Sequence, residues 1–145
     1  MPSEALESIY TVNLGVKADE RVLVFTDLIG ENEEVSDDER GRRKALVGIA
    51  SDVADAGESL CKVEYMEFKA AGNHGKEPPR ELWEACFGTK AIDILDEKGI
   101  LERLLSKRAN AEVLKAAEEI IEKHAECPAA IIALSHYSTS HTRQR

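Results

Sequence analysis

The stretch Arg21-Val-Leu-Val-Phe-Thr-Asp27 decides the fold of this chain. It is a continuous apolar run of β-branched and aromatic residues, which is typical of a buried strand in a parallel sheet. Residues 60–68 form a second run, in which apolar and charged residues partly alternate, and this predicts a strand nearer the sheet edge. Residues 129–134 form a third run without a polar residue, which we interpret as a core strand.

Helical patterns fill the segments between these runs, and glycine, proline or asparagine marks most of their ends. The predicted helices are residues 4–13, ending at Gly15; residues 44–56, ending at Gly57; a helix opened by Pro78-Pro79 and closed by Gly88; a helix over 91–106 broken at Gly99; and a strongly amphipathic helix capped by Asn110. The order predicts an α/β fold: a small three-layer domain with a mostly parallel sheet of at least three strands flanked by helices. We expect residues 1–145 to form a single α/β domain.

Composition narrows the classes of function. The chain has 145 residues, 43% of them hydrophobic, and a net charge of −9, which disfavours binding to nucleic acid or to an anionic membrane. Its longest apolar run is too short to span a bilayer, and the N-terminus shows no signal peptide. The 3 cysteines are odd in number and widely spaced, so we expect reduced core thiols and a cytoplasmic location.

The segment 28–40 carries six acidic residues within nine positions, at 31, 33, 34, 37, 38 and 39. It lacks the alternating ligands and central glycine of a calcium-binding EF-hand loop. We therefore predict a solvated, mobile loop.

The richest chemistry follows the third predicted strand. The carboxyl end of a parallel strand is where α/β proteins bind ligands. The segment supplies hydroxyls, imidazoles and a guanidinium that suits a carboxylate or phosphate: His136, Ser138, Thr139, Ser140, His141, Thr142 and Arg143. A polar turn whose hydroxyls bond the local backbone would contain the same residue types, so both interpretations stay open.

Asp27 ends the first predicted strand at the same edge of the sheet. Its carboxylate could orient a substrate or a metal ion, although a role as a turn or helix cap is the more common one for aspartate. The two histidines at 136 and 141 do not have the spacing of a helical metal pair, and His74 is an isolated loop histidine. Familiar zinc, nucleotide and hydrolase motifs are absent, so no complete active site can be assigned.

Three segments together resemble one family of enzymes. Tyr10-Thr-Val-Asn-Leu-Gly-Val-Lys-Ala-Asp-Glu-Arg-Val-Leu-Val-Phe-Thr-Asp27 resembles the start of the aminopeptidase T (leucyl aminopeptidase-like) family of metallopeptidases. Glu77-Pro-Pro-Arg-Glu-Leu-Trp-Glu-Ala-Cys-Phe-Gly88 resembles the proline-opened helix of a bacterial subset, and Ser138-Thr-Ser-His-Thr-Arg143 resembles the family's Ser/Thr-rich segment after an apolar strand.

The resemblance implies an amino-terminal α/β domain of a peptidase that removes N-terminal residues from peptides at a two-metal site. The Glu, His and Asp ligands of that site lie later in the family's polypeptide and match no position here. We therefore expect divalent metal ions only in the full-length family, a missing C-terminal catalytic domain as partner, and a homodimer. The residues expected to touch peptide substrate are Asp27, Ser138, Thr139, His141, Thr142 and Arg143.

The resemblance also implies that this chain alone is inactive. Its Thr-Arg-Gln-Arg145 ending is what a trypsin-like cut in an exposed loop would leave, which suggests a proteolytic fragment. The alternative is a free-standing α/β module whose terminal segment binds a small anion, such as a phosphate, a nucleotide or an amino-acid carboxylate.

Overall fold

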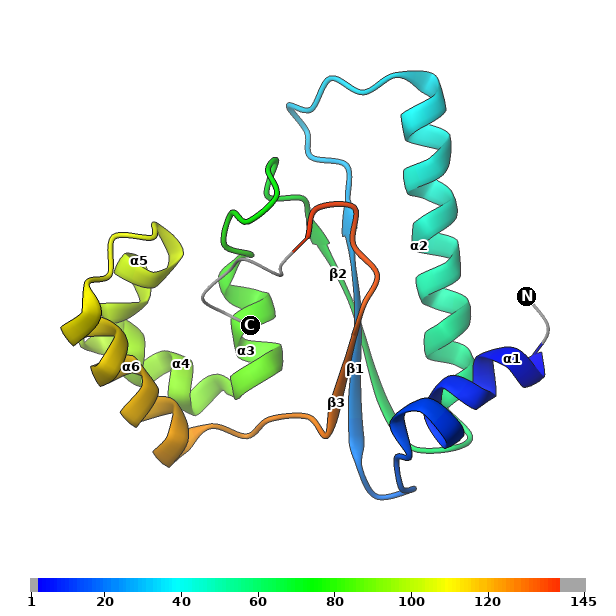
Figure 1. Ribbon diagram of the computed structural model, residues 1–145. Coiled ribbons are helices and arrows are strands. Elements are labelled where there is room, and N and C mark those ends of the chain that lie inside the picture. Colours follow the sequence, from blue (N-terminus) through cyan, green and yellow to red (C-terminus); the bar gives the residue numbers. More distant parts are fainter. Residues whose placement is uncertain (1–2, 139–145) are drawn as a thin grey trace. The chain divides into compact units, whose positions relative to one another are not determined.

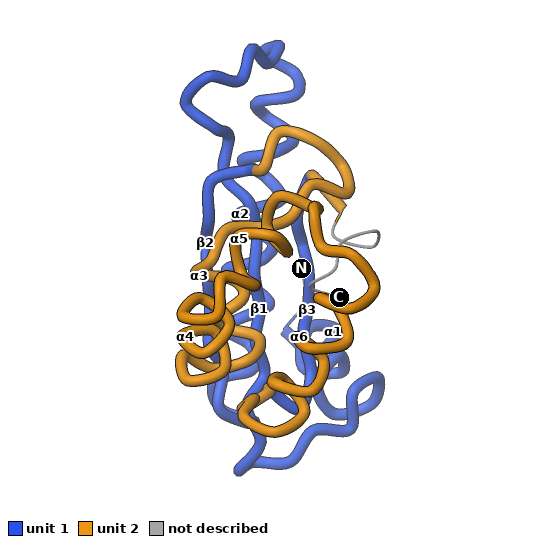
Figure 2. The backbone as a smooth tube through the Cα atoms, turned by 90° about the vertical axis from the view of Figure 1, so that its left-hand side faces the viewer, with its two compact units in different colours: residues 1–70, 128–136 blue, residues 71–127, 137–145 orange. Residues whose placement is uncertain are grey.

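The computed structural model describes residues 3–138. The chain divides into two compact units. Unit 1 comprises residues 1–70 and 128–136, and unit 2 comprises residues 71–127 and 137–145 (Figure 2). Unit 1 contains the sheet and unit 2 is helical, so each is described by itself.

The sheet of unit 1 has three parallel strands. β1 (Arg21–Leu28) lies in the centre, between β2 (Lys62–Lys69) and β3 (Ala130–Ala133). In the register of the sheet, Val24 lies opposite Tyr65 of β2 and Ile132 of β3. The α/β fold with a parallel sheet is therefore confirmed, and the continuous apolar run forms its central strand.

The two outer strands differ in how well the sequence predicted them. β2 alternates between exposed charged residues and half-buried apolar ones, as expected of a strand at the sheet edge. The prediction of a buried core strand at 129–134 was wrong in part, because β3 also lies at an edge of the described sheet and is only half-buried. Its Ile131 is 44% exposed. An apolar run alone does not reveal how many neighbours a strand has.

One face of the sheet packs against the helices of unit 1. These are α1 (Ser3–Ser8), the π-helical turn η1 (Ile9–Leu14) and the long α2 (Asp37–Gly57), which runs beside the strands (Figure 1). Gly15 ends η1, as predicted, and it does so in the left-handed conformation. The buried residues of this core are Leu6, Tyr10, Val22, Val24, Val53, Ala54 and Cys61.

Gly57 is required for a different reason from the one the sequence suggested. The sequence predicted that Gly57 stops the helix as a C′ glycine would, but Gly57 is the last residue of α2 and its φ is not positive. A Cβ at this position would instead collide with the ring of Tyr10, with the phenol oxygen 2.7 Å away. The same hydroxyl donates a hydrogen bond to the Val53 carbonyl. The absence of a side chain at 57 therefore allows the tyrosine to pack onto the end of α2.

α2 begins at Asp37, so the prediction of an acidic loop over 28–40 was wrong for its last four residues. Ser36 caps the helix by accepting a hydrogen bond from the Glu39 amide at 3.2 Å. The acidic residues 37–39 lie in the first turn, where carboxylates interact favourably with the helix dipole. A run of acids that looked like a solvated loop is therefore partly a helix start.

Unit 2 consists of four helices: α3 (Arg80–Phe87), α4 (Thr89–Glu97), α5 (Ile100–Leu105) and α6 (Ala111–His124). Gly88 and Gly99 separate the first three with positive φ values of +86° and +69°. The Asn110 side chain accepts a hydrogen bond from the Val113 amide at 2.9 Å and caps α6. These predictions are confirmed, and the helices bury Trp83, Ile92, Leu95, Leu101, Leu104 and Ala117 together.

Cys61 and Cys86 are buried free thiols, and burial raises the pKa of Cys61 above its usual value. Cys127 is exposed, which corrects the expectation of three core cysteines. It lies between α6 and β3, where the chain leaves the helical core. Over residues 3–138, no helix is both long and apolar enough to cross a membrane.

Candidate functional site

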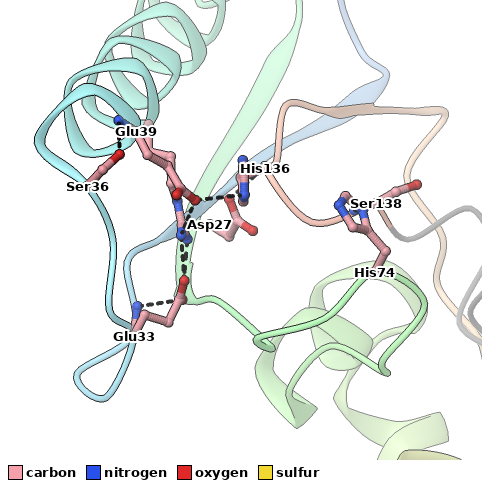
Figure 3. Close-up of polar contacts among 9 residues, drawn as sticks. Asp27, Glu33, Ser36, Glu39, His74, His136 and Ser138 are labelled. Carbon is pink, nitrogen blue, oxygen red and sulfur yellow. Dashed lines mark hydrogen bonds and ion pairs between the residues drawn. The ribbon is translucent and has the colours of Figure 1, made fainter.

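Asp27 joins the carboxyl ends of β1 and β3. It is 2% exposed, and its Oδ1 accepts a hydrogen bond of 2.7 Å from the backbone amide of His136, just after β3 (Figure 3). The Leu134 amide also donates to the Phe25 carbonyl at 2.9 Å, which continues the pairing past the last residue of β3. A buried carboxylate that accepts a backbone N–H anchors the segment that follows the strand. Substrate contact by Asp27 stays a prediction.

A network of ion pairs lies beside this anchor and centres on Arg43 of α2. Arg43 is 3% exposed, and its Nη1 lies 2.5 Å from Oε2 of Glu33, in the loop after β1. Oε1 of Glu33 also accepts a hydrogen bond from the Gly30 amide at 2.8 Å. Glu33 therefore fixes both the loop backbone and a buried guanidinium, which holds the loop against α2.

Glu39 connects this network to His136. Its Oε1 lies 3.9 Å from Nη1 of Arg43 and 3.4 Å from Nε2 of His136. Figure 3 shows Glu39 between the helix and the segment after β3. Through these contacts the loop after β1, the start of α2 and the segment after β3 form one polar cluster. The contacts described for this cluster all join residues of unit 1.

Two hollows lie beside the first turns of α2, and Arg43 lines both. The Asp27 hollow has a volume of about 220 Å³ and is lined by Asp27, Leu28, Ile29, Arg40, Arg43, Lys44 and Val47. The His136 hollow has a volume of about 390 Å³ and is lined by Glu39, Arg42, Arg43, Ala45, Leu46, Ile49 and His136. Small-molecule sites are typically apolar hollows with a few polar groups, and both hollows have that composition.

The sequence analysis named Asp27 and His136 but missed the cations of α2 that line these hollows. Residues 40–44 read Arg-Gly-Arg-Arg-Lys, which places four cations within five positions of a chain whose net charge is −9. That run was the available signal. The burial of Arg43 could not have been read from it, because the partner that permits burial, Glu33, lies ten residues earlier in a loop.

In unit 2, Ser138 pairs with a histidine that the sequence had given no role. The Ser138 amide donates to Nδ1 of His74 at 3.0 Å, and the Gly75 amide donates to the Ser138 carbonyl at 3.2 Å. The rings of His74 and Tyr137 meet edge to face, with centroids 5.3 Å apart. Because Nδ1 accepts, the hydrogen of a neutral His74 ring lies on Nε2. The 70–77 loop thus binds the start of the terminal segment.

The other predicted site residues, Thr139, His141, Thr142 and Arg143, lie outside the described residues. Between residues 3 and 138, no three His, Cys, Asp or Glu side chains are grouped so that they could hold a metal ion. No catalytic step is assigned to the described part of the chain.

Comparisons with protein-family models, with curated proteins and with solved structures find no match to this chain. Its function must therefore be argued from its own residues.

Proposed function

We propose that this chain is the amino-terminal α/β part of a metal-dependent aminopeptidase-like hydrolase, in which it forms one wall of the peptide-binding cleft or a dimer contact. The proposal is supported by the resemblance of residues 10–27, 77–88 and 138–143 to that family. The observation that carries it furthest is the hydrogen bond from the His136 amide to Asp27. It fixes a polar segment at the carboxyl ends of two parallel strands, where α/β proteins bind ligands.

The chemistry of such an enzyme would come from divalent metal ions that activate water and polarise the scissile carbonyl. In this proposal the metal ligands belong to a C-terminal catalytic domain and not to this chain. The role of the chain is to hold the polar segment rigidly and to present its hydroxyls and cations to a peptide. Ser138 and the terminal residues 139, 141, 142 and 143 are the proposed substrate contacts, and the proposed location is the cytoplasm.

The first test compares the 145-residue chain with the protein expressed from the complete reading frame. Both are assayed with leucine 4-nitroanilide in the presence of cobalt, zinc or manganese. The proposal expects hydrolysis by the longer protein and none by the 145-residue chain. A reading frame that stops after Arg145 would instead support the free-standing anion-binding module. A longer protein that folds, binds metal and cleaves no aminoacyl substrate would also overturn the proposal.

A second test uses Asp27 in the complete protein. Asp27→Ala removes the acceptor that anchors the segment after β3, so we expect kcat/KM to fall about tenfold, mainly through a higher KM. Asp27→Asn keeps an acceptor oxygen at the same position and should retain most of the affinity. Equal kinetics for the wild type and Asp27→Ala would show that this edge of the sheet does not shape the cleft.

A further inference from the structure

The Asp27 hollow lies entirely within unit 1, between the end of β1 and the first three turns of α2. Arg40, Lys44 and Val47 follow one another at helical spacing along its side. Leu28 and Ile29 lie at the end of β1. The accessible lining of the hollow is almost wholly apolar, and Arg40 and Lys44 add two cationic side chains along its α2 side.

The cations of the hollow are not equivalent. Arg43 is buried and pairs with Glu33. Arg40 and Lys44 are exposed, and neither makes an ion pair with any residue in the described range 3–138. Two like charges four residues apart on a helix repel each other, so an anion placed between them would be stabilised by both.

The apolar residues indicate what kind of anion fits. A bare inorganic anion would leave Leu28, Ile29 and Val47 in contact with water, whereas an aliphatic chain would cover them. The hollow is small, with a volume of about 220 Å³, so an aliphatic chain that it holds must be short. A short branched carboxylate such as 3-methylbutanoate combines one negative charge with an aliphatic chain of that kind.

We propose that the Asp27 hollow binds a small branched aliphatic carboxylate, with its carboxylate between Arg40 and Lys44 and its chain on Leu28, Ile29 and Val47. This site belongs to the 145-residue chain itself, and it does not depend on whether the chain is part of a peptidase. Asp27 also lines the hollow; its carboxylate is 2% exposed and accepts a hydrogen bond from the His136 amide, and it would disfavour a second negative charge on the ligand.

The His136 hollow is a natural comparison, because it has an apolar side and a cation but a different charge pattern. Its rim carries Glu39, whose carboxylate already lies near His136 and Arg43. The Glu39 side chain is 29% exposed, whereas Asp27 is 2% exposed, so a carboxylate ligand in the His136 hollow would meet the more accessible like charge. Arg42, an exposed cation that lines this hollow and not the other, is therefore a matched control for Arg40 and Lys44.

The test is a titration of the ¹⁵N-labelled 145-residue chain with 3-methylbutanoate at pH 7, followed by amide chemical shifts. We expect saturable shifts confined to residues 27–29 and 40–47. The uncharged isostere 3-methylbutanamide lacks the negative charge, and acetate lacks the branched aliphatic chain. Each should therefore bind at least about tenfold more weakly than 3-methylbutanoate. The double variant R40Q/K44Q should lose affinity by about tenfold or more, whereas R42Q should keep it.

Val47→Phe tests the hollow independently of its charges. It fills the apolar side while Arg40 and Lys44 stay in place, and it should abolish binding in a chain whose amide spectrum remains dispersed. Equal binding of the carboxylate and the amide would overturn the proposal. So would phosphate binding as tightly as 3-methylbutanoate, or the same loss of affinity in R42Q as in R40Q/K44Q. None of these outcomes changes the result expected from the peptidase assay.

Discussion

In unit 1 the contacts that fix the core join residues far apart in the sequence, whereas in unit 2 many of them join near neighbours. The Tyr10 hydroxyl donates to a carbonyl 43 residues away, and the His136 amide donates to a side chain 109 residues away. In unit 2 the Gly88 amide bonds the Glu84 carbonyl at 2.8 Å, and Asn110 caps a helix three residues ahead. Long-range contacts therefore stabilise unit 1, and local contacts contribute more to the stability of unit 2.

This difference has a consequence for each unit. Local caps and apolar stripes each contribute a modest and separable free energy, so unit 2 should respond to each substitution in proportion to the buried apolar surface that it removes. A long-range interaction such as that of Tyr10 with the end of α2 closes a large loop of chain, so its removal affects elements at both ends. The substitutions below test whether the two units respond separately.

The largest effect is expected in the apolar core of unit 2. Leu95 is fully buried in α4, and Leu95→Ala should lower the free energy of unfolding by about 3 kcal/mol, since it leaves a cavity. Urea unfolding measures this value. Glu97→Ala, at an exposed position of the same helix, should cost less than about 0.5 kcal/mol. In Leu95→Ala, amide hydrogen exchange should become faster mainly in α3–α6. An equal increase in the exchange rate of β1 would contradict the expectation that the two units respond separately.

Gly57→Ala should destabilise unit 1 by about 2 kcal/mol, because the new methyl group would overlap the Tyr10 ring. The matched control is Gly48→Ala in the same helix, where a Cβ would meet no atom within 4 Å. That control should stabilise the chain by about 1 kcal/mol, because alanine is the better helix former. Thermal unfolding measures both changes. If the two substitutions shifted the unfolding temperature in the same direction, the proposed packing of Tyr10 on Gly57 would be wrong.

Tyr10 also makes the stability of unit 1 sensitive to alkaline pH. Burial, with a smaller contribution from the negative charge of the nearby Cys61 thiolate, raises the pKa of Tyr10 to about 12. Above pH 10 the unfolded chain loses the phenol proton and the folded chain keeps it, so stability falls as the pH rises from 10 towards 12. The slope from this group approaches about 1.4 kcal/mol for each pH unit.

Tyr10→Phe provides the comparison for that pH dependence. It removes the titrating group, so the decline of unfolding free energy with pH should be shallower than in the wild type, whatever its effect at neutral pH. Urea unfolding at several values between pH 9 and pH 11 measures the two slopes. Identical slopes would show that Tyr10 does not remain protonated in the folded chain over this range.

The parts of the fold that could be predicted are those that depend on local patterns. The unbroken run at 21–27 identified the central strand, and Gly88, Gly99 and Asn110 identified the helix boundaries, because backbone conformation and capping are decided within a few residues. Gly57 was placed correctly at a helix end but for the wrong reason, since its partner Tyr10 lies far away in sequence.

The candidate site was less predictable for the same physical reason. Asp27 and the segment after β3 could be assigned to one sheet edge, because parallel strands end together. Their hydrogen bond, and the pairing of Arg43 with Glu33, depend on side-chain positions that no spacing rule specifies. Likewise His74 appeared isolated in sequence, although the structure brings its ring to the Ser138 amide.

The smallest expected effect concerns the start of α6. Asn110→Ala removes the acceptor for the Val113 amide and should cost about 1 kcal/mol, whereas Asn110→Asp should cost much less because its carboxylate caps the same amide. Amide hydrogen exchange should increase in the first turn of α6 and stay unchanged in the strands of unit 1. A comparable increase in β1 would mean that this local cap also stabilises the long-range core. Local stabilisation of unit 2 could then no longer be separated from the long-range stabilisation of unit 1.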